Sequence, residues 1–505
     1  PPQIGIAVDG GDLNAVTRFS GKRDEVRFID FLPSSLPYAI GKNKSVLIME
    51  PKGGLPVLTA LYYGSKNIDR IESNPVITEA VNRALRDFSG NIYKENTFTG
   101  LGRAWLKTRG SYDIIDISLT GILPWESGSF GISEEFRLTR EAFIDYEQHL
   151  KQDGYICITL YFLPPARTEL RLLSTINSAM KEIGINDAYR RISVIRSWNT
   201  VTILFKKGDL QPQDIAGIRK FARDRNFDLV YYPGIREAES NIFNKLPNND
   251  YFRLVSGIMN PAGYEAAVDG YLFDIAPVTD ERPFFHNFLR VKNLFETYRL
   301  AGSKWQYFME EGYLIPIILG QAIALSVLLI LLPLFKKEGR VIFSLQVFIY
   351  FSGIGLGFMF LEIAIIQKFI LYLDHPIYAV TVVIAAILLS SGIGSLVSQR
   401  FSVERNWKGG AVLLAAVFGI IYSILLKHIV GATLGWEFSN RLMLSIALLA
   451  PMGFFMGMPF PMGIRYLAAT KGSKFIPWAW GVNGAFSVVG SILAALLALG
   501  AGFSG

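Results

Sequence analysis

The sequence predicts a doubly wound α/β domain followed by a bundle of membrane helices. Up to about Glu311, short apolar runs typical of buried strands alternate with segments of helical period, as in a mostly parallel sheet covered by helices. After Glu311, long apolar runs dominate, each near the ~20 residues needed to cross a bilayer. The third observation is the stretch Ser45–Glu72, which has the pattern of a βαβ unit.

That stretch combines an apolar run, the turn EPKGG, an apolar helix and a second strand that ends in Glu72. A glycine-bearing turn of this kind brings backbone N–H groups and a helix N-terminus up to a ligand. An acid at the tip of the second strand is where nucleoside-binding folds place a carboxylate for ribose hydroxyls.

The remaining apolar runs extend the same pattern along the chain. Further strands are expected at Asn91–Glu95, Tyr112–Ser118, Gly154–Leu160, Ile192–Ser197 and Thr200–Phe205, and helices at 73–87, 100–107, 139–150, 168–183 and 211–226. The expected domains are a β-rich lead-in (1–40), a nucleoside-binding α/β domain (41–206), an α/β extension with an amphipathic connector (207–311) and a six-helix membrane domain (312–505).

Composition excludes several classes of protein. A single cysteine, Cys157, rules out an internal disulfide framework and a cysteine-based metal cluster, and the four histidines are scattered, so no metal site is expected. The net charge of +7 is better explained by loops that flank membrane helices than by a nucleic-acid channel, because no basic stripe interleaved with aromatics is present.

The C-terminal part contains six candidate spans. They lie at about 313–335, 342–366, 376–398, 409–430, 441–464 and 477–504, with small residues recurring as close helix packing requires. Prolines and glycines at 451–463 predict a broken helix. Glu362, deep in the second span, is either an intramembrane functional carboxylate or a structural hydrogen-bonding group.

Several motifs together resemble the polyamine aminopropyltransferase (spermidine synthase-like) family, and specifically its multi-span membrane branch. The soluble motifs are VLIMEPKGGLPVLTALYYG, IESNP, GRAWL, YDIIDISLT and SEEFRLTREAFIDYEQHLKQDG, and the later ones are TDERPFFHNFLR, GFMFLEIAIIQKF, GMPFPMGIR and PWAWGVNGAFSVVGS. The resemblance implies a Rossmann-like methyltransferase fold that binds an S-adenosylmethionine-type nucleoside. Members often carry further spans before the soluble domain, so we expect sequence to be missing before Pro1.

The resemblance also implies site residues, and the sequence departs from the family pattern at several of them. The implied cofactor-binding positions are Lys52, Gly53, Gly54, Glu72, Asn74, Leu101 and Gly102, and the candidate acceptor-binding positions are Asp116, Ser118, Glu126 and Glu134. Glu50 and Lys52 replace glycines of the turn, Leu101 replaces the acid that reads adenine, and the Asp-rich loop begins with Ser118 in place of an aspartate. Asp116 shares a face with Ser118 but lies ~7 Å further from the strand tip.

Two functions follow from these residues. The first is a non-catalytic relative, acting as a structural or assembly subunit of a membrane complex or in transport. The second is a membrane-tethered transferase that moves an aminopropyl group from decarboxylated S-adenosylmethionine to an amine. In this second hypothesis Glu72 holds the ribose, and Asp116, Glu126 or Glu134 holds the acceptor amine. A Rossmann NAD enzyme is disfavoured because the turn lacks G-x-G-x-x-G.

The charged loops predict an orientation in the membrane. The loops at 336–340, 399–408 and 465–474 carry nine Lys and Arg residues, whereas the opposite side carries Lys368, Lys427 and Arg441. The positive-inside rule then places the soluble domain on the non-cytoplasmic face of a bacterial inner membrane. The basic residues of the connector lie on the opposite side and reduce the difference in the number of basic residues between the two sides. Expected partners are the lipid bilayer and other membrane proteins or a second copy of the chain, with no nucleic acid.

Overall fold

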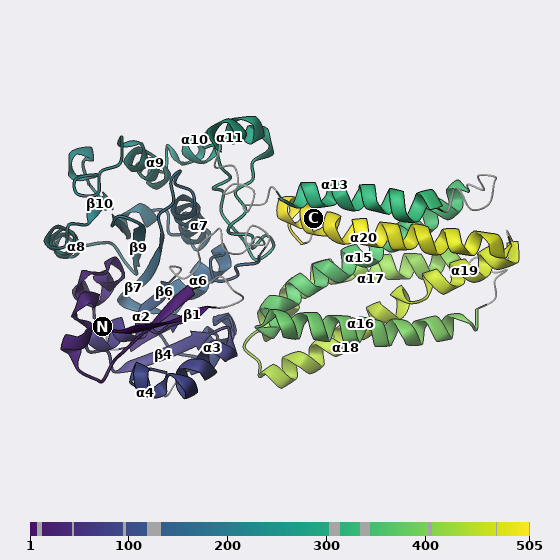
Figure 1. Ribbon diagram of the computed structural model, residues 1–505, viewed down its shortest axis with the longest axis horizontal. Coiled ribbons are helices and arrows are strands. Elements are labelled where there is room, and N and C mark those ends of the chain that lie inside the picture. Colours follow the sequence, from purple (N-terminus) through teal and green to yellow (C-terminus); the bar gives the residue numbers. More distant parts are fainter. Residues whose placement is uncertain are drawn as a thin grey trace. The chain divides into compact units, whose positions relative to one another are not determined.

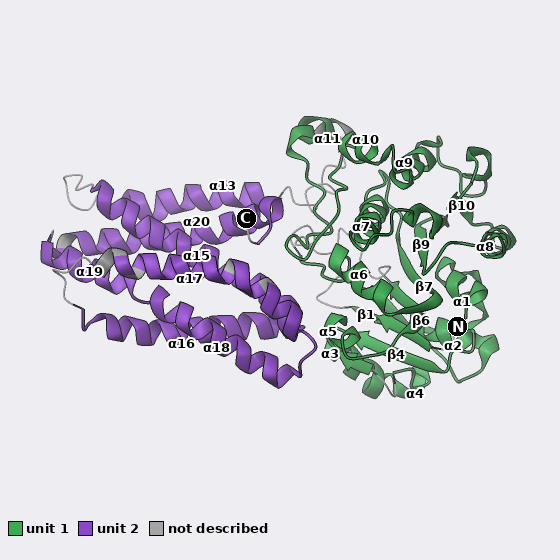
Figure 2. Ribbon diagram, turned by 180° about the vertical axis from the view of Figure 1, so that it is seen from behind, with its two compact units in different colours: residues 1–312 green, residues 313–505 purple. Residues whose placement is uncertain are grey.

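The structure is a computed structural model of the 505-residue chain, and it describes residues 1–7, 13–42, 45–93, 97–118, 133–301, 314–333, 344–401, 407–470 and 472–503. The chain divides into two compact units, Pro1–Gly312 and Tyr313–Gly505 (Figure 2). The boundary agrees with the change in hydropathy that the sequence shows near Glu311.

An eight-stranded sheet forms the centre of the first unit, in the order β10-β8-β9-β7-β6-β3-β4-β5 (Figure 1). Its strands are β3 (Ser45–Met49), β4 (Asn67–Glu72), β5 (Thr97–Thr99), β6 (Tyr112–Ser118), β7 (Leu150–Tyr161), β8 (Ile192–Arg196), β9 (Thr200–Lys206) and β10 (Asp228–Tyr231). Strands β3 to β7 pair in parallel, whereas β9 runs antiparallel to both β7 and β8. This is a Rossmann-like methyltransferase fold, and its strand order reverses between β3 and β6.

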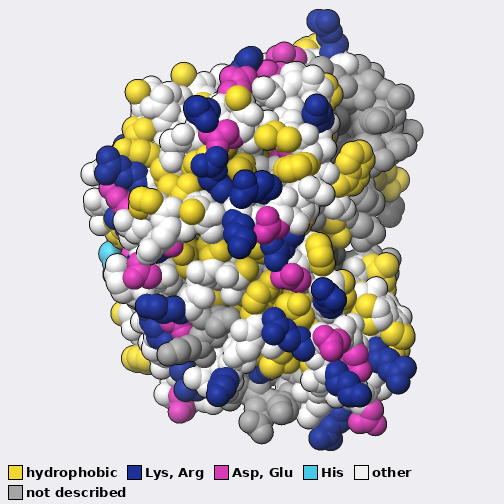
Figure 3. Space-filling model, turned by 90° about the vertical axis from the view of Figure 1, so that its left-hand side faces the viewer, with side chains coloured by type: hydrophobic (Ala, Val, Ile, Leu, Met, Phe, Trp, Pro, Cys, Tyr) yellow, Lys and Arg dark blue, Asp and Glu magenta, His cyan; other side chains and the backbone are white. Residues whose placement is uncertain are grey.

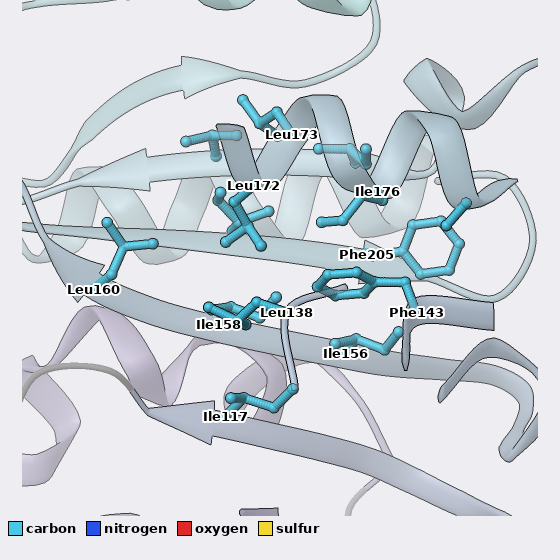
Figure 4. Close-up of a cluster of buried hydrophobic side chains, with 14 of the residues drawn as sticks. Ile117, Leu138, Phe143, Ile156, Ile158, Leu160, Leu172, Leu173, Ile176 and Phe205 are labelled. Atoms are coloured by element: carbon cyan, nitrogen blue, oxygen red, sulfur yellow. The ribbon is translucent and has the colours of Figure 1, made fainter. Parts of the chain in front are cut away.

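Helices cover both faces of this sheet. On one face, alternate residues of β6 and β7 pack against α6 (Arg140–Gln148) and α7 (Thr168–Glu182), and the side chains of Ile117, Ile158, Phe143 and Leu172 converge there (Figure 4). On the other face, Val46, Ile48 and Ile114 pack with α2 (Leu55–Tyr62), and Cys157 packs near α1 (Leu36–Ile40) and α8 (Pro212–Asp224). The near-continuous apolar strands follow from burial on both faces.

Two expectations about strands need correction. Asn91–Glu95 was expected to be a strand, but residues 91–93 form a turn in which Asn91 has a φ of 55°, and β5 begins at Thr97. β10 was not expected, because Asp228–Tyr231 is short and follows a helix without a strong strand pattern. β10 pairs with β8, so the sheet continues beyond residue 206.

The lead-in contains less β structure than the sequence suggested. A hairpin of β1 (Gln3–Ala7) and β2 (Leu13–Thr17) is followed by the 3-10 helices η1 (Arg23–Phe31) and η2 (Pro33–Ser35), and then by α1. Val16 of β2 is buried in the same core as α2, which fixes the hairpin against the first βαβ unit.

The C-terminal part of the first unit is tied to the sheet by one buried arginine. Arg171 of α7 is fully buried and donates hydrogen bonds to the carbonyl groups of Phe285 and Asn287 at 2.9 and 2.5 Å, and it pairs with the Asp274 carboxylate at 3.0 Å. These contacts hold the segment DERPFFHNF, which follows α9 (Asp250–Met259) and α10 (Tyr264–Asp269).

The surface of this unit carries charges of both signs. On the face seen in Figure 3, Lys and Arg side chains are interspersed with Asp and Glu.

The second unit is a helical bundle. Among its described residues, four helical segments are long and apolar enough to cross a membrane: Leu345–Leu373, Pro376–Ser398, Phe438–Thr470 and Ile476–Ala501. Two shorter apolar stretches, Ile315–Leu331 and Val412–Leu426, lie where the first and fourth spans were expected. The helices are α13 (Leu314–Ser326), α15 (Leu345–Leu373), α16 (Pro376–Ser398), α17 (Trp407–Thr433), α18 (Phe438–Met456), α19 (Pro459–Thr470) and α20 (Ile476–Ala501). The expected break within 451–463 is confirmed, because α18 ends at Met456 and α19 begins at Pro459.

Glycines set the spacing between α16 and α18. A Cβ atom at Gly394 of α16 would collide with the carbonyl oxygen of Phe454, and one at Gly457 would collide with that of Ser391. Small residues allow two helix backbones to come this close, as is common within membranes.

Three basic residues that were expected in loops lie in helices. Lys368, Lys427 and Arg441 lie inside α15, α17 and α18, and Arg441 donates to the carbonyl oxygen of Tyr372 at 2.5 Å.

Candidate functional site

The candidate site is the turn between β3 and α2, at the point where the strand order reverses. Glu50 and Lys52 adopt left-handed conformations, with φ of 56° and 48°, and Gly54 does so as the N-cap of α2 with φ of 89°. A non-glycine residue held in this region costs on the order of 1–3 kcal/mol and persists only where its surroundings enforce it. Two such residues in one turn therefore indicate strong local constraints.

The two glycines of this turn contact other parts of the protein closely. A Cβ at Gly53 would collide with the carbonyl oxygen of Ala15 in β2, and one at Gly54 would collide with the side chain of Ile92. The Tyr93 hydroxyl donates to the carbonyl oxygen of Lys52. The lead-in hairpin and the segment after α4 (Arg86–Ser89) thus occupy the close-approach positions that a ligand was expected to use.

Glu72, at the end of β4, is fully buried and joins the turn to the next helix. Its Oε2 accepts the backbone N–H of Lys52 at 3.0 Å, and its Oε1 accepts that of Asn74 at 3.1 Å. Asn74 in turn caps α3 (Pro75–Glu79), because its side-chain oxygen accepts the N–H of Val76 at 2.9 Å. Glu72 and Asn74 therefore lie at the strand end, as predicted, and both bind backbone groups.

A buried cluster of charges, formed by Glu50, Lys52, Glu135 and Arg137, lies at the same end of the sheet. The Arg137 guanidinium bonds Glu135 through two nitrogens, at 2.6 and 2.5 Å, and its Nη1 lies 2.9 Å from Glu50 Oε1. Glu50 also accepts the N–H and the hydroxyl of Ser73, at 3.1 and 3.0 Å. All four members of this cluster are buried. Bidentate arginine–carboxylate pairs are among the stronger polar contacts in proteins.

The electrostatics of the cluster are internally balanced. Burial raises the pKa of Glu135 to about 7, whereas the backbone N–H of Arg137 and the ammonium of Lys52 favour its charged form. Two cations face two carboxylates, so the four members of the cluster carry no net charge when all are ionised, and the buried Glu72 carboxylate at the same turn binds the backbone N–H groups of Lys52 and Asn74. Removing one member would leave a buried charge without compensation.

The adenine side of the expected pocket is apolar. Leu101 is half-buried between β5 and α5 (Arg103–Leu106), and its side chain has no hydrogen-bonding group. A Cβ at Gly102, which has a φ of 90°, would collide with Met49 Cε. Phe98 stacks on Trp105 with ring centroids 3.5 Å apart. Arg103 forms ion pairs with Asp145 and Asp280, which fix α5 against α6.

Asp116 points into the core on the sheet face that α1 covers. Its Oδ2 accepts the Tyr38 hydroxyl at 2.7 Å, and its Oδ1 has no hydrogen-bond partner within the described part of the chain. Burial raises the pKa of Asp116 to about 7, and the hydroxyl of Tyr38 opposes this shift. Asp116 is thus enclosed between Tyr38 and the sheet, with an exposed fraction of 1%.

The other expected acceptor residues are placed only in part. Ser118 is the last residue of β6. Glu134 is half-buried and directly precedes Glu135 of the charge cluster in the sequence. Glu126 lies outside the described residues. Glu362 is half-buried in α15. Sequence reasoning missed Glu135 and Arg137. The motif EEFR contains both, but Glu134 was selected because the sequence does not indicate which of two adjacent acids faces inwards.

Neither a protein-family model nor a curated protein matches the sequence. Among solved structures, the chain is similar to spermidine synthase from Thermotoga maritima, with 17% identity, a TM-score of 0.28, and coverage of 44% of this chain and 74% of that one. It is also similar to a probable spermidine synthase from Corynebacterium glutamicum (11% identity, TM-score 0.28, 39% and 70% coverage). A third similar structure is an rRNA methylase from Streptococcus thermophilus (17% identity, TM-score 0.24, 35% and 94% coverage).

Proposed function

We propose that this chain is an integral membrane protein whose spermidine synthase-like domain is non-catalytic and serves as a structural or assembly subunit of a membrane complex. The observation that carries the proposal is the buried cluster of Glu50, Lys52, Glu135 and Arg137 at the glycine turn. These side chains bind one another and the backbone where a nucleoside would be held.

The charge of the expected ligand supports this proposal. Decarboxylated S-adenosylmethionine carries a sulfonium and an ammonium group, so its reactive end is cationic. The Arg137 guanidinium and the Lys52 ammonium are buried near the turn, and their carboxylate partners are already neutralised. A cation entering this site would meet no unpaired carboxylate within the cluster, and its desolvation would be poorly compensated.

The features expected of an acceptor site also favour a non-catalytic role. Aminopropyl transfer needs a deprotonated amine next to the sulfonium carbon, and an acid–base group within hydrogen-bond reach of that amine. Asp116 is bonded to Tyr38 within the core, and the side chain of Leu101 has no acceptor for the adenine amino group. An unpaired buried donor costs roughly 1–3 kcal/mol.

One observation favours the alternative, a membrane-tethered transferase that uses S-adenosylmethionine or its decarboxylated form. Glu72 lies at the tip of β4, next to a turn that holds two non-glycine residues in left-handed conformations. Backbone strain gathers at functional sites, and the Glu72 carboxylate accepts the backbone N–H groups of Lys52 and Asn74 beside that turn. In that alternative Glu72 would hold the ribose.

A turnover assay separates the two functions. The full chain in lipid nanodiscs is incubated with decarboxylated S-adenosylmethionine and putrescine, and methylthioadenosine is measured, with a soluble spermidine synthase in the same buffer as the positive control. We expect no product above the background of empty nanodiscs. Product formation that Glu72→Gln abolishes would overturn the non-catalytic proposal and support the transferase. Loss of product in Asp116→Asn would assign the acceptor site as well.

We further propose that the first unit lies on the non-cytoplasmic side of a bacterial inner membrane. Nine basic residues within the sequence ranges 336–340, 399–408 and 465–474 support this orientation, and two of them, Lys408 and Arg465, lie in α17 and α19. In that compartment cytosolic S-adenosylmethionine is out of reach, which agrees with a non-catalytic role. Partners would then be other membrane proteins or a second copy of this chain.

A further inference from the structure

The segment η7 (Val291–Asn293) and α11 (Leu294–Ala301) has its apolar side chains on the outside. Val291, Leu294 and Phe295 are 76%, 45% and 88% exposed. They are three and four residues apart, so they form one stripe along the helical segment. Three neighbouring apolar side chains that are exposed on one short segment of a charged domain indicate a surface that binds a partner.

The opposite side of this segment is polar and faces the protein. Asn293 donates from its amide nitrogen to the carbonyl oxygens of Leu272 and Tyr271, at 2.8 and 3.2 Å. Thr297, one turn further on, is buried. Arg290, just before the segment, donates to the carbonyl oxygens of Asp269 and Tyr271 at 2.7 and 2.9 Å. These contacts fix the rotation of the segment, so its apolar stripe cannot turn inwards without breaking them.

Charged residues border the stripe. Lys292, Glu296 and Arg299 are exposed, and at 100° per residue they lie between the apolar stripe and the polar side that faces the protein. An apolar stripe with basic residues along one edge is typical of a helix that lies in a membrane surface, where cations meet phosphate groups and apolar side chains reach the acyl boundary.

We propose that this segment docks in the lipid–water interface, with Val291, Leu294 and Phe295 in the acyl boundary and Lys292 and Arg299 at the headgroups. The chain itself favours lipid over a protein partner. Only residues 302–313 separate α11 from the apolar helix α13, and twelve residues span at most ~40 Å. A three-residue stripe is also small beside the ~800 Å² per partner that a stable protein interface buries.

Site-directed spin labelling of the full chain tests this proposal. Phe295→Cys, Glu296→Cys and Trp198→Cys variants are labelled in nanodiscs of phosphatidylcholine and phosphatidylglycerol. Trp198 is 79% exposed, between β8 and β9. The native thiol Cys157 is buried, and the unsubstituted chain gives the labelling background. Relaxation of each label by oxygen, which concentrates in lipid, is compared with relaxation by a water-soluble nickel chelate.

If the segment is docked in the interface, oxygen should relax the label at 295 several times more than the nickel chelate does. At 296 and 198 the nickel chelate should relax the label more than oxygen does. Equal accessibility of 295 and 198 to the nickel chelate would overturn the proposal, because the stripe would then lie in water. Protection of 295 from both reagents would also overturn it, because a protein surface, such as a second copy, would then cover the stripe.

Discussion

The carboxylate of Glu72 accepts the backbone N–H of Lys52 at 3.0 Å, which joins the end of β4 to the turn after β3. In nucleoside-binding folds an acid at this strand tip holds a ribose. Here its two oxygens bind the backbone of the turn and of Asn74, and the adjacent Glu50 binds Ser73 and Arg137. The polar groups at the centre of the expected pocket therefore bind one another.

Arg137→Met is expected to destabilise the first unit strongly. The substitution keeps most of the side-chain volume but removes the guanidinium that pairs with both Glu50 and Glu135 and leaves Lys52 as the remaining cation of the cluster. Breaking a buried ion pair in this way typically costs ~3–5 kcal/mol. Urea unfolding of the detergent-solubilised chain, followed by pulse proteolysis, measures the change in the free energy of unfolding. Arg83→Met is the matched control, because Arg83 forms an exposed pair with Glu79 and such pairs contribute ~0–1 kcal/mol. Equal effects of the two substitutions would contradict the role given to the cluster.

Asp116→Asn is expected to flatten the dependence of stability on pH. Burial raises the pKa of Asp116 from 3.8 to about 7, so between these values the folded state binds more protons than the unfolded state. Its contribution to the free energy of unfolding therefore falls as pH rises from 5 to 8, by on the order of 2 kcal/mol. The variant should lose less stability than the unsubstituted chain over that range in the same urea assay. Parallel pH profiles would show that Asp116 titrates normally.

Gly394→Ala is expected to weaken the helical bundle. Its Cβ would collide with the carbonyl oxygen of Phe454, and separating two packed helices costs ~1–3 kcal/mol. Gly392→Ala is the matched control on α16, since a Cβ at Gly392 has no atom within 4 Å. Fluorescence-detected size exclusion after heating gives the melting temperature of each variant. A drop confined to Gly394→Ala is the predicted result, and equal melting temperatures would contradict the packing described here.

The predicted orientation of the first unit is open to a labelling test in intact cells. Trp198→Cys places a thiol on an exposed hairpin of that unit, and Cys157 is buried. If the proposed orientation holds, an impermeant maleimide should modify the variant before the inner membrane is permeabilised, because the positive-inside rule then keeps this unit outside the cytoplasm. Labelling that requires permeabilised inner membranes would reverse the orientation.

The fold was largely predictable because its strands are strongly patterned. The runs SVLIM, YDIIDIS and GYICITL are buried on both faces, and each forms a strand near its expected bounds. The short strands β5 and β10 were missed or displaced, because three or four residues carry little periodicity. Lys368 was assigned to a loop because α15 extends beyond the expected span at 342–366, whereas Lys427 and Arg441 already lie within the expected spans at 409–430 and 441–464.

The candidate site was predictable only in outline. The turn, Glu72 and Asn74 are local features of one βαβ unit, so the sequence indicated them directly. Glu135 and Arg137 lie far from this unit in the sequence, just before α6, and their pairing with Glu50 depends on tertiary structure. The interaction of Asp116 with Tyr38 was hidden for the same reason, because the two residues are 78 positions apart.

We propose that the protein's own side chains occupy the nucleoside site, and a binding measurement tests this. The full chain in nanodiscs is titrated calorimetrically with S-adenosylmethionine, its decarboxylated form and methylthioadenosine, with empty nanodiscs as the blank. We expect no saturable heat for any of the three up to ~1 mM, which corresponds to a binding free energy weaker than about −4 kcal/mol. Saturable micromolar binding that Glu72→Gln removes would contradict it.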